Sequence, residues 1–245
     1  MAGFLTLMRS KTNWCCVIKL RMPIAFLGAS LLYFSAPSVI ADSKAPKTTV
    51  PLSIVFLGTS LTANYTWPNE IGAKLSHCLD QKVVVENLAV AGANSEDGLE
   101  QLRQMHSNNP KLVLVEFSVN DADIWDGLSL HASRVHHEAL IEAVRLNSAK
   151  TEIVLLTMNP VHGMRGLMRP YLLEYYRLYK DLAAAKGVAF ADLHVAWDQV
   201  LSPSTVSAML PDGLHPSASA SSQVAKSALF PAILQVLGAP RTERC

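Results

Sequence analysis

The sequence predicts a single-domain α/β protein in which a five-stranded parallel sheet lies between two layers of helices, a three-layer α/β/α sandwich. Short apolar runs typical of buried strands recur at 52-57, 82-87, 111-117, 152-158 and 188-192. Longer segments with helical patterns separate them, which favours βαβ crossovers within one sheet covered on both faces. About 200 residues remain after a predicted leader, a length that suits one well-buried core.

The N-terminal segment, 1-41, is predicted to be a secretory signal peptide. It contains four basic residues and no acidic residue, followed by an apolar run that ends in Ser38-Val39-Ile40-Ala41. The stretch from Met22 to Ala41 is also long enough for an uncleaved membrane anchor. We therefore expect an exported chain, periplasmic or secreted, with possible membrane association through this segment. The other predicted segments are a short linker at 42-50, the domain at 51-238 and a C-terminal tail at 239-245.

Charge patterning argues against nucleic acid as a partner. Without the four basic residues of the leader, 17 basic and 20 acidic residues remain. No basic stripe with interleaved aromatic residues is present, and a mildly acidic surface does not gain from the release of counterions. The sequence does not indicate an oligomeric state.

The first two predicted strands each lead into a turn with residues suited to a site. The strand at 52-57 runs into Gly58-Thr59-Ser60-Leu61-Thr62, which places Ser60 just beyond the strand end. A helix is predicted to begin at Trp67-Pro68, because proline suits a first helical turn. The strand at 82-87 precedes Gly92, and a further helix start follows at Ser95-Glu96-Asp97, where acidic residues meet the positive end of the helix dipole.

The later elements add Asn120, Asp212 and His215 to these candidate site residues. The third strand leads into Ser118-Val119-Asn120-Asp121, and the segment Asp212-Gly213-Leu214-His215-Pro216 holds an acid and an imidazole three residues apart. Serine, histidine and aspartate together are the parts of an activated hydroxyl nucleophile, although each alone is an ordinary turn residue. The remaining helices are predicted at 129-149, 167-186 and 217-237.

Four blocks, around Ser60, Gly92, Asn120 and the Asp212/His215 pair, resemble in this order the SGNH hydrolase family, also called the GDSL esterases and lipases. The resemblance runs from residue 52 to about residue 235. It implies that Ser60 is the nucleophile, His215 the general base and Asp212 the carboxylate that orients the imidazole. The backbone N–H groups of Ser60 and Gly92 and the side chain of Asn120 are implied to form the oxyanion hole.

The family also implies a flavodoxin-like strand order, 2-1-3-4-5. In such a sheet the ligand crevice lies beyond the carboxyl ends of the strands, which is where the turns carrying Ser60, Gly92 and Asn120 are predicted. The loop with Asp212 and His215 is expected to reach this edge from before the last helix. No Gly-X-Ser-X-Gly motif is present, which argues against the α/β-hydrolase fold.

Two positions depart from the family pattern. Thr59 stands where the family's Gly-Asp-Ser-Leu block has aspartate, and we expect a change in local hydrogen bonding without loss of the nucleophile. Ser118 stands where the Gly-X-Asn-Asp block has glycine, and its side chain is expected to take up space near the oxyanion site and narrow the substrate range.

Together with the predicted leader, the resemblance implies an exported serine esterase that hydrolyses carboxylic esters through an acyl-serine intermediate, with no cofactor and no metal. Acyl groups, acetyl in particular, on carbohydrates or lipids are the expected substrates. Trp125, His162 and Arg165 are candidate substrate-binding residues, because their loops follow the third and fourth strands. Trp125 equally suits a hydrophobic plug over the sheet edge, and Arg165 a solvated loop. The alternatives are an O-acyltransferase of the same type and a noncatalytic glycan-binding protein of the same fold.

Cys78 and Cys245 are the cysteines that remain after the leader. They can pair in an oxidising compartment, which would tie the C-terminal tail to the end of the first helix, but the sequence does not give their distance. Neither has the spacing of a metal site. The histidines His131, His136 and His137 are interpreted as a partly solvated helix face, with zinc binding as the second choice.

Overall fold

The computed structural model describes residues 50–239 and Cys245. Five strands form one sheet in the order β2-β1-β3-β4-β5, and each neighbouring pair is parallel. Both the parallel sheet and the strand order implied by the resemblance are therefore confirmed. The strands are β1 (Leu52–Gly58), β2 (Val83–Asn87), β3 (Leu112–Glu116), β4 (Glu152–Leu156) and β5 (Ala189–Ala191).

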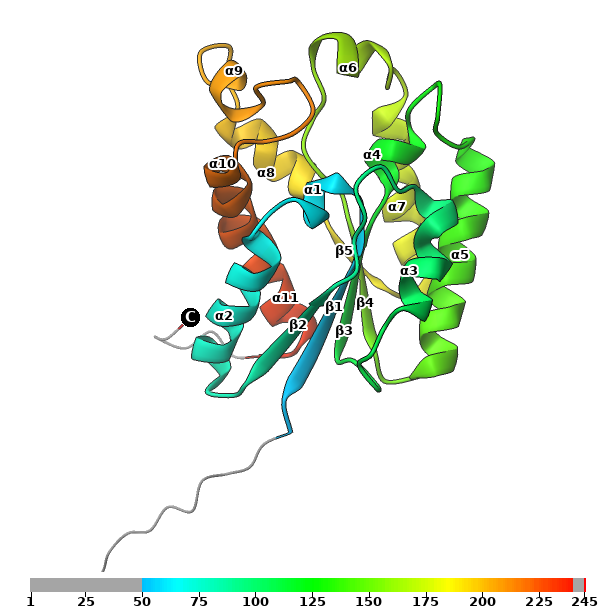
Figure 1. The fold of residues 1–245 in the computed structure, drawn as a ribbon, viewed down its shortest axis with the longest axis vertical. Coiled ribbons are helices and arrows are strands. Elements are labelled where there is room, and N and C mark those ends of the chain that lie inside the picture. The colour runs from blue at the N-terminus through cyan, green and yellow to red at the C-terminus, as the bar shows by residue number, and fades with distance from the viewer. Residues whose placement is uncertain (1–49, 240–244) are drawn as a thin grey trace, which may run out of the picture. The chain divides into compact units, whose positions relative to one another are not determined.

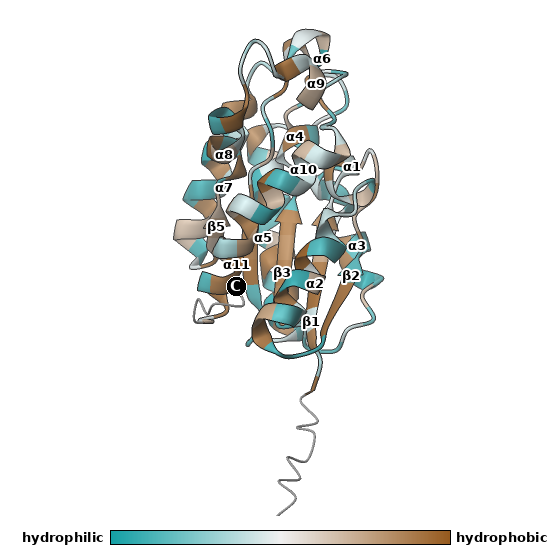
Figure 2. Cartoon of the chain, turned by 90° about the vertical axis from the view of Figure 1, so that its left-hand side faces the viewer, coloured by the Kyte–Doolittle hydropathy of each residue, from teal (hydrophilic) through white to brown (hydrophobic). Residues whose placement is uncertain are grey.

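The central strands are buried on both faces because helices cover the sheet from each side. Ile54, Val55 and Leu57 of β1 are fully buried, and β3 is buried along its whole length. This is the environment that a continuous apolar run predicts, in contrast to the alternating pattern of a strand with one wet face. Figure 2 shows the resulting contrast between hydrophobic central strands and helices that also carry hydrophilic residues.

Two groups of helices make the two outer layers (Figure 1). One face of the sheet packs against α2 (Trp67–Leu79), α8 (Leu193–Val200), α10 (Ala218–Val224), the π-helical turn η2 (Ala225–Leu229) and α11 (Phe230–Val236). The other face packs against α3 (Gly98–Arg103), α5 (Leu130–Asn147) and α7 (Leu172–Lys186). Short helical turns complete the chain: α1 (Ser60–Ala63), η1 (Ser95–Asp97), α4 (Ser118–Asp121), α6 (Gly163–Leu167) and α9 (Val206–Met209).

Trp67 links the core to the turn that follows β1. Its side chain is 1% exposed, and its ring meets Phe56 edge-on with the ring centroids 5.3 Å apart. The indole N–H donates to the backbone carbonyl of Leu61 at 3.0 Å, so this buried polar group is satisfied. Burial of a large aromatic side chain contributes roughly 2–3 kcal/mol. The same contact fixes the start of α2 against the segment that contains Ser60.

The predicted helix at 167-186 is wrong at its N-terminal end. The chain forms the short α6, leaves the helical path and starts α7 at Leu172. Pro170 lies in the interruption, where proline lacks an N–H for the helical ladder and disfavours the helical conformation of the residue before it. The helices α8 and α9 were not predicted.

The predicted leader, 1-41, and the linker up to residue 49 lie outside the described residues, as do residues 240–244 of the predicted tail. The domain boundaries therefore stay predictions. Among residues 50–239 and Cys245, none of the helices combines the length and the hydropathy that a membrane span requires.

Cys78 and Cys245 form a disulfide, with their Cα atoms 4.9 Å apart. Cys78 lies in the last turn of α2, so the bond joins the C-terminal end of the chain to this helix across a sequence separation of 167. The possible pairing of the two cysteines is thus realised in the structure.

Loss of this disulfide is expected to lower the free energy of unfolding by about 2–4 kcal/mol, because the bond restricts the unfolded chain. Urea unfolding of the Cys78→Ala and Cys245→Ala variants and of the double variant, under oxidising conditions, measures the effect. All three should lose a similar amount, since each lacks the same bond. Losses that add in the double variant would show that the cysteines act independently.

Candidate active site

Ser60, His215 and Asp212 form a continuous hydrogen-bonded chain. Ser60 Oγ lies 2.9 Å from His215 Nε2, and His215 Nδ1 lies 2.7 Å from Asp212 Oδ2. A carboxylate only accepts hydrogen bonds, so His215 carries its proton on Nδ1, and its Nε2 accepts the bond that the Ser60 hydroxyl donates. Residues separated by 155 positions in the sequence thus meet in the order that activates a hydroxyl nucleophile.

Ser60 is the first residue of the short helix α1, which sets its position. The chain leaves β1 at Gly58, and Thr59 caps α1 with a side chain that accepts from the Leu61 N–H at 3.2 Å. Ser60 itself is 8% exposed, and its hydroxyl faces the imidazole of His215. The backbone N–H at the start of such a helix has no partner within the helix.

The loop that carries Asp212 and His215 turns sharply at Gly213. The φ angle of Gly213 is +81°, and a Cβ at this position would lie 2.4 Å from the His162 carbonyl oxygen, so glycine is required. Other segments hold the loop from outside. The Tyr65 hydroxyl donates to the Pro216 carbonyl (2.7 Å), the Asn159 amide to the Leu214 carbonyl (2.8 Å) and the His162 N–H to the Gly213 carbonyl (2.7 Å).

Asp212 is held in its ionised form. Partial burial raises its pKa, but hydrogen bonds from the His215 side chain and from the N–H groups of His215 and Leu214 outweigh it and lower the pKa to about 2. The two N–H groups lie 2.6 and 2.9 Å from Asp212 Oδ1. The carboxylate therefore stays charged across the neutral range and can stabilise a protonated His215.

Ser60 lines a pocket with a volume of about 500 Å³. Gly92, Asn120 and His215 also line this pocket, so of the five residues implied to form the triad and the oxyanion hole only Asp212, which lies behind His215, is not part of the lining. The other polar residues of the lining are Asn64, Asn94, Asp123, Asp126, Arg165 and Arg169. The pocket is thus rich in hydrogen-bonding and charged groups.

Gly92 follows β2 and Asn120 follows β3, the two strands that pair with β1, and hydrogen bonds beyond the strand ends bring the two segments together. The Val90 N–H donates to the Gly58 carbonyl at 3.0 Å, which extends the pairing of β1 beyond the end of β2 and leads the chain to Gly92. The Asn120 amide donates to the Ala93 carbonyl at 2.8 Å. This bond joins the segment after β2 to the turn after β3.

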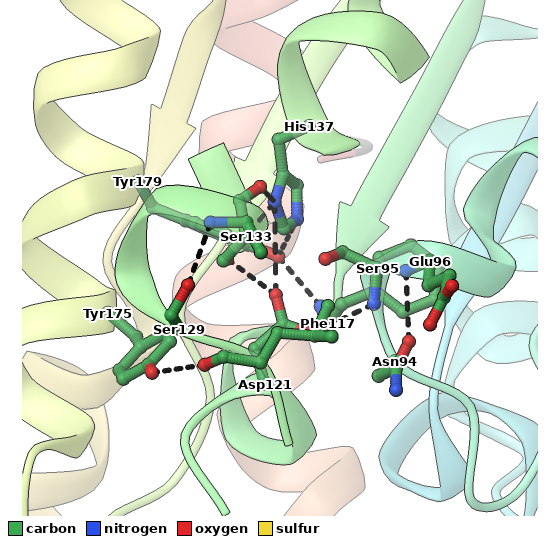
Figure 3. A network of polar contacts seen from close by, with 12 residues as sticks. Asn94, Ser95, Glu96, Phe117, Asp121, Ser129, Ser133, His137, Tyr175 and Tyr179 are labelled. Carbon is green, nitrogen blue, oxygen red and sulfur yellow. Dashed lines mark hydrogen bonds and ion pairs between the residues drawn. The ribbon is translucent and has the colours of Figure 1, made fainter. Parts of the chain in front are cut away.

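Asp121 strengthens the same junction through polar contacts of its own, which Figure 3 shows. Its Oδ1 accepts from the Ser95 N–H at 2.8 Å, and its Oδ2 accepts from the Ser133 hydroxyl at 2.5 Å. The carboxylate is fully buried, so both bonds are needed to offset its loss of hydration. Asp121 therefore ties η1 and α5 to the turn that contains Asn120.

His137 corrects one sequence interpretation. It is 1% exposed and does not belong to a solvated helix face, whereas His131 is exposed and His136 half-buried. The His137 Nδ1–H donates to the Ser133 carbonyl at 2.7 Å, so Nε2 accepts from the Tyr179 hydroxyl, also at 2.7 Å. Burial lowers the pKa of His137 although the charge of Asp121 opposes this, and the imidazole is neutral.

Arg169 is a pocket residue that sequence patterns did not reveal. Its guanidinium lies 2.9 Å from Asp123 Oδ2, and its Nε–H donates to the Val119 carbonyl at 2.7 Å. Arg169 is 7% exposed, in the interruption between α6 and α7. It therefore fixes the residue just before Asn120, and only the fold places it there.

The three candidate substrate-binding residues differ in position. Arg165 lines the pocket. Trp125 is 76% exposed outside the pocket lining, and His162 lines a neighbouring apolar groove beside α9, with Leu201 and Val206 among its residues. Their roles stay predictions. Ser118 is fully buried and does not line the pocket, so its side chain does not narrow the substrate space as expected.

In the region the structure describes, no three side chains of His, Cys, Asp or Glu cluster in a way that could hold a metal ion.

Comparison with known proteins identifies the family. The profile of the GDSL-like lipase/acylhydrolase family matches residues 56–221, which include every residue of the hydrogen-bonded chain and of the pocket. The chain belongs to this family. It is thus an acylhydrolase, an enzyme that hydrolyses ester bonds. None of the curated proteins compared with the chain matches it.

Solved structures share the fold of this acylhydrolase. A lipase/acylhydrolase from Enterococcus faecalis is 23% identical, with a TM-score of 0.62, over 75% of this chain and 94% of the other. An acetylxylan esterase from Geobacillus stearothermophilus is 18% identical, with a TM-score of 0.61, over 77% of this chain and 95% of the other. At these identities the likeness establishes the architecture and leaves the substrate open.

The buried ion pair of Arg169 leads to a stability prediction for this acylhydrolase. Replacing Arg169 by leucine should lower the free energy of unfolding by about 3 kcal/mol, because Asp123 and the Val119 carbonyl would lose their partner. The exposed neighbour Arg165 provides the control, and Arg165→Leu should change stability by less than about 0.5 kcal/mol. Urea unfolding of both variants measures the difference, and equal losses would contradict a structural role for the ion pair.

Proposed function

We propose that this acylhydrolase is an exported serine esterase that cleaves carboxylic esters through an acyl-Ser60 intermediate. The observation that carries the proposal is the contact of Ser60 Oγ with His215 Nε2 at 2.9 Å, backed by Asp212 at 2.7 Å from Nδ1. A serine hydroxyl needs a base within about 2.6–3.2 Å to take its proton during attack. The distance between Ser60 Oγ and His215 Nε2 meets this condition.

In the proposed first step Ser60 Oγ attacks the ester carbonyl while its proton passes to His215 Nε2. The charge on Asp212 stabilises the imidazolium that forms, because the pKa of this carboxyl, lowered to about 2, keeps it ionised. The protonated His215 then gives its proton to the leaving alcohol. In the second step His215 takes a proton from water, whose oxygen attacks the acyl-Ser60 carbonyl. The bond between the acyl carbon and Ser60 Oγ then breaks, His215 returns its proton to Oγ, and the carboxylic acid leaves.

The negative oxygen of each tetrahedral intermediate needs hydrogen-bond donors. We assign this role to the N–H groups of Ser60 and Gly92 and to the amide of Asn120, which share one pocket. One amide hydrogen of Asn120 donates to the Ala93 carbonyl, which orients the group and leaves the second hydrogen for the substrate. The network of Asp121 beneath this turn keeps the donor in place.

A short acyl group on a carbohydrate fits this pocket best. The lining contains the amides of Asn64 and Asn94 and the charged groups of Asp123, Asp126 and Arg165, which match the hydroxyl groups of a sugar better than a long alkyl chain. One structure with the same fold is named an acetylxylan esterase. We therefore propose an acetylated carbohydrate as the substrate class.

Export is proposed on two grounds. The predicted leader at 1-41 directs the chain out of the cytoplasm, and the Cys78–Cys245 disulfide is typical of proteins in oxidising compartments.

Replacing Ser60 by alanine should reduce the hydrolysis of p-nitrophenyl acetate by at least about 10⁴-fold, because the nucleophile is lost. Ser53→Ala, at the opposite end of β1, is the matched control and should keep activity. Wild-type rates should fall from the acetyl to the butyryl and octanoyl esters. Unchanged turnover without Ser60 would refute the nucleophile, and a preference for octanoyl would refute the short acyl group.

Replacing Asn120 by alanine should lower kcat by about 100-fold or more, because one donor to the oxyanion is lost. KM should change little, since the charge on this oxygen develops only in the transition state. Steady-state kinetics with p-nitrophenyl acetate separate the two constants. A rise in KM at constant kcat would instead assign Asn120 to substrate binding.

A further inference from the structure

Glu116, the last residue of β3, is a carboxylate enclosed beneath the Ser60 turn. It is 1% exposed. Its Oε1 accepts from the Thr59 N–H and from the Thr62 hydroxyl, both at 2.7 Å, and the Thr59 hydroxyl lies 3.1 Å from Oε2. Thr59 precedes Ser60 and Thr62 follows it by two residues, so one buried carboxylate holds the chain on both sides of Ser60.

Gly58 makes room for this carboxylate. The strand register places Gly58 opposite Glu116, and a Cβ on Gly58 would lie 2.3 Å from Glu116 Oε1. The backbone of Gly58 is held in turn by the Gln101 side chain from α3. Gln101 Oε1 accepts from the Gly58 N–H and its Nε2–H donates to the Gly58 carbonyl, each at 2.9 Å.

The stability of the sheet does not require a carboxylate at the position of Glu116. Burial raises the pKa of Glu116 to about 7, although hydrogen bonds from Thr62 and Thr59 oppose the shift. A well-packed apolar side chain commonly stabilises a core as much as a buried charge does. The donors gathered by Glu116 all belong to the Ser60 turn, which indicates a role in its geometry.

We infer that Glu116, together with Gln101, is a positioning residue that fixes the Ser60 turn so that the hydroxyl reaches His215. The inference rests on the proposed function of Ser60. Neither side chain lines the pocket, so both act through the backbone and through Thr59 and Thr62. A displacement of about 1 Å in a reacting group can cost about 100-fold in rate.

The Thr62→Val variant tests the inference, because it removes one donor to Glu116 and keeps the shape of the side chain. We expect kcat for p-nitrophenyl acetate to fall by about 10- to 100-fold with KM within about twofold. Thr62→Ser, which restores a hydroxyl, should return kcat to within about threefold of wild type. Glu116→Gln, which places an amide donor against the donors of the turn, should lower kcat in the same way.

Thr151→Val is the matched control for the loss of a buried hydroxyl. Thr151 is also buried, and its hydroxyl donates to the Pro110 carbonyl at 2.7 Å, but it precedes β4 at the opposite edge of the sheet. This variant should lose similar stability in urea and keep kcat. Equal losses of kcat in the Thr62 and Thr151 variants, or none in either, would overturn the positioning role.

A second readout reports on Ser60 itself. A fluorophosphonate is attacked by Ser60 Oγ, fluoride leaves, and the hydroxyl proton passes to His215, so the labelling rate measures the reactivity of the nucleophile. We expect this rate to fall in parallel with kcat in Thr62→Val and Glu116→Gln. A wild-type chain that neither hydrolyses esters nor reacts with the probe would defeat the proposed function and the inference together. An active wild type with unchanged variants would defeat the inference alone.

Discussion

The parallel pairing of β1 with β3 is the constraint on which the rest of the site depends. In this register Gly58 lies opposite Glu116, so the two strands end side by side. The turns that follow carry Ser60 and Asn120 and start from adjacent points on one edge of the sheet. A slip of one residue would send every buried side chain of β1 to the opposite face. The core that fixes the register therefore also fixes the separation between the serine and its neighbouring hydrogen-bond donors.

Asp212 and His215 reach the same edge by different means, since no strand carries them. Their loop is held by hydrogen bonds from Tyr65, Asn159 and His162, which come from segments that follow β1 and β4. These bonds satisfy backbone carbonyls that a loop against the core would otherwise leave unpaired. The distance between Ser60 and His215 is thus set by two independent supports, the sheet register and the bonds to the loop.

Three buried charged groups near the pocket each have hydrogen-bond or ion-pair partners. Glu116 meets donors of the Ser60 turn, Asp121 bridges Ser95 and Ser133, and Arg169 holds Asp123. Such groups contribute little net stability compared with apolar packing. Their hydrogen bonds are directional, however, so they fix the orientation of the segments that they join, which apolar contacts do not. A rigid polar shell fits an enzyme whose reacting groups must be aligned before the substrate arrives.

The sequence by itself determined the strands, their parallel arrangement and the residues of the four blocks, because apolar runs and turn residues are local signals. It also drew attention to Thr59, whose contacts with Glu116 only the fold reveals. The tertiary structure decided the burial of His137, the position of Arg169 and the closeness of Cys78 to Cys245. Glu116 carried a weak local signal, an acidic residue inside an apolar strand, whereas Arg169 carried none. These features depend on which distant segments meet, and that is set by packing over the whole sheet rather than by neighbouring residues in the chain.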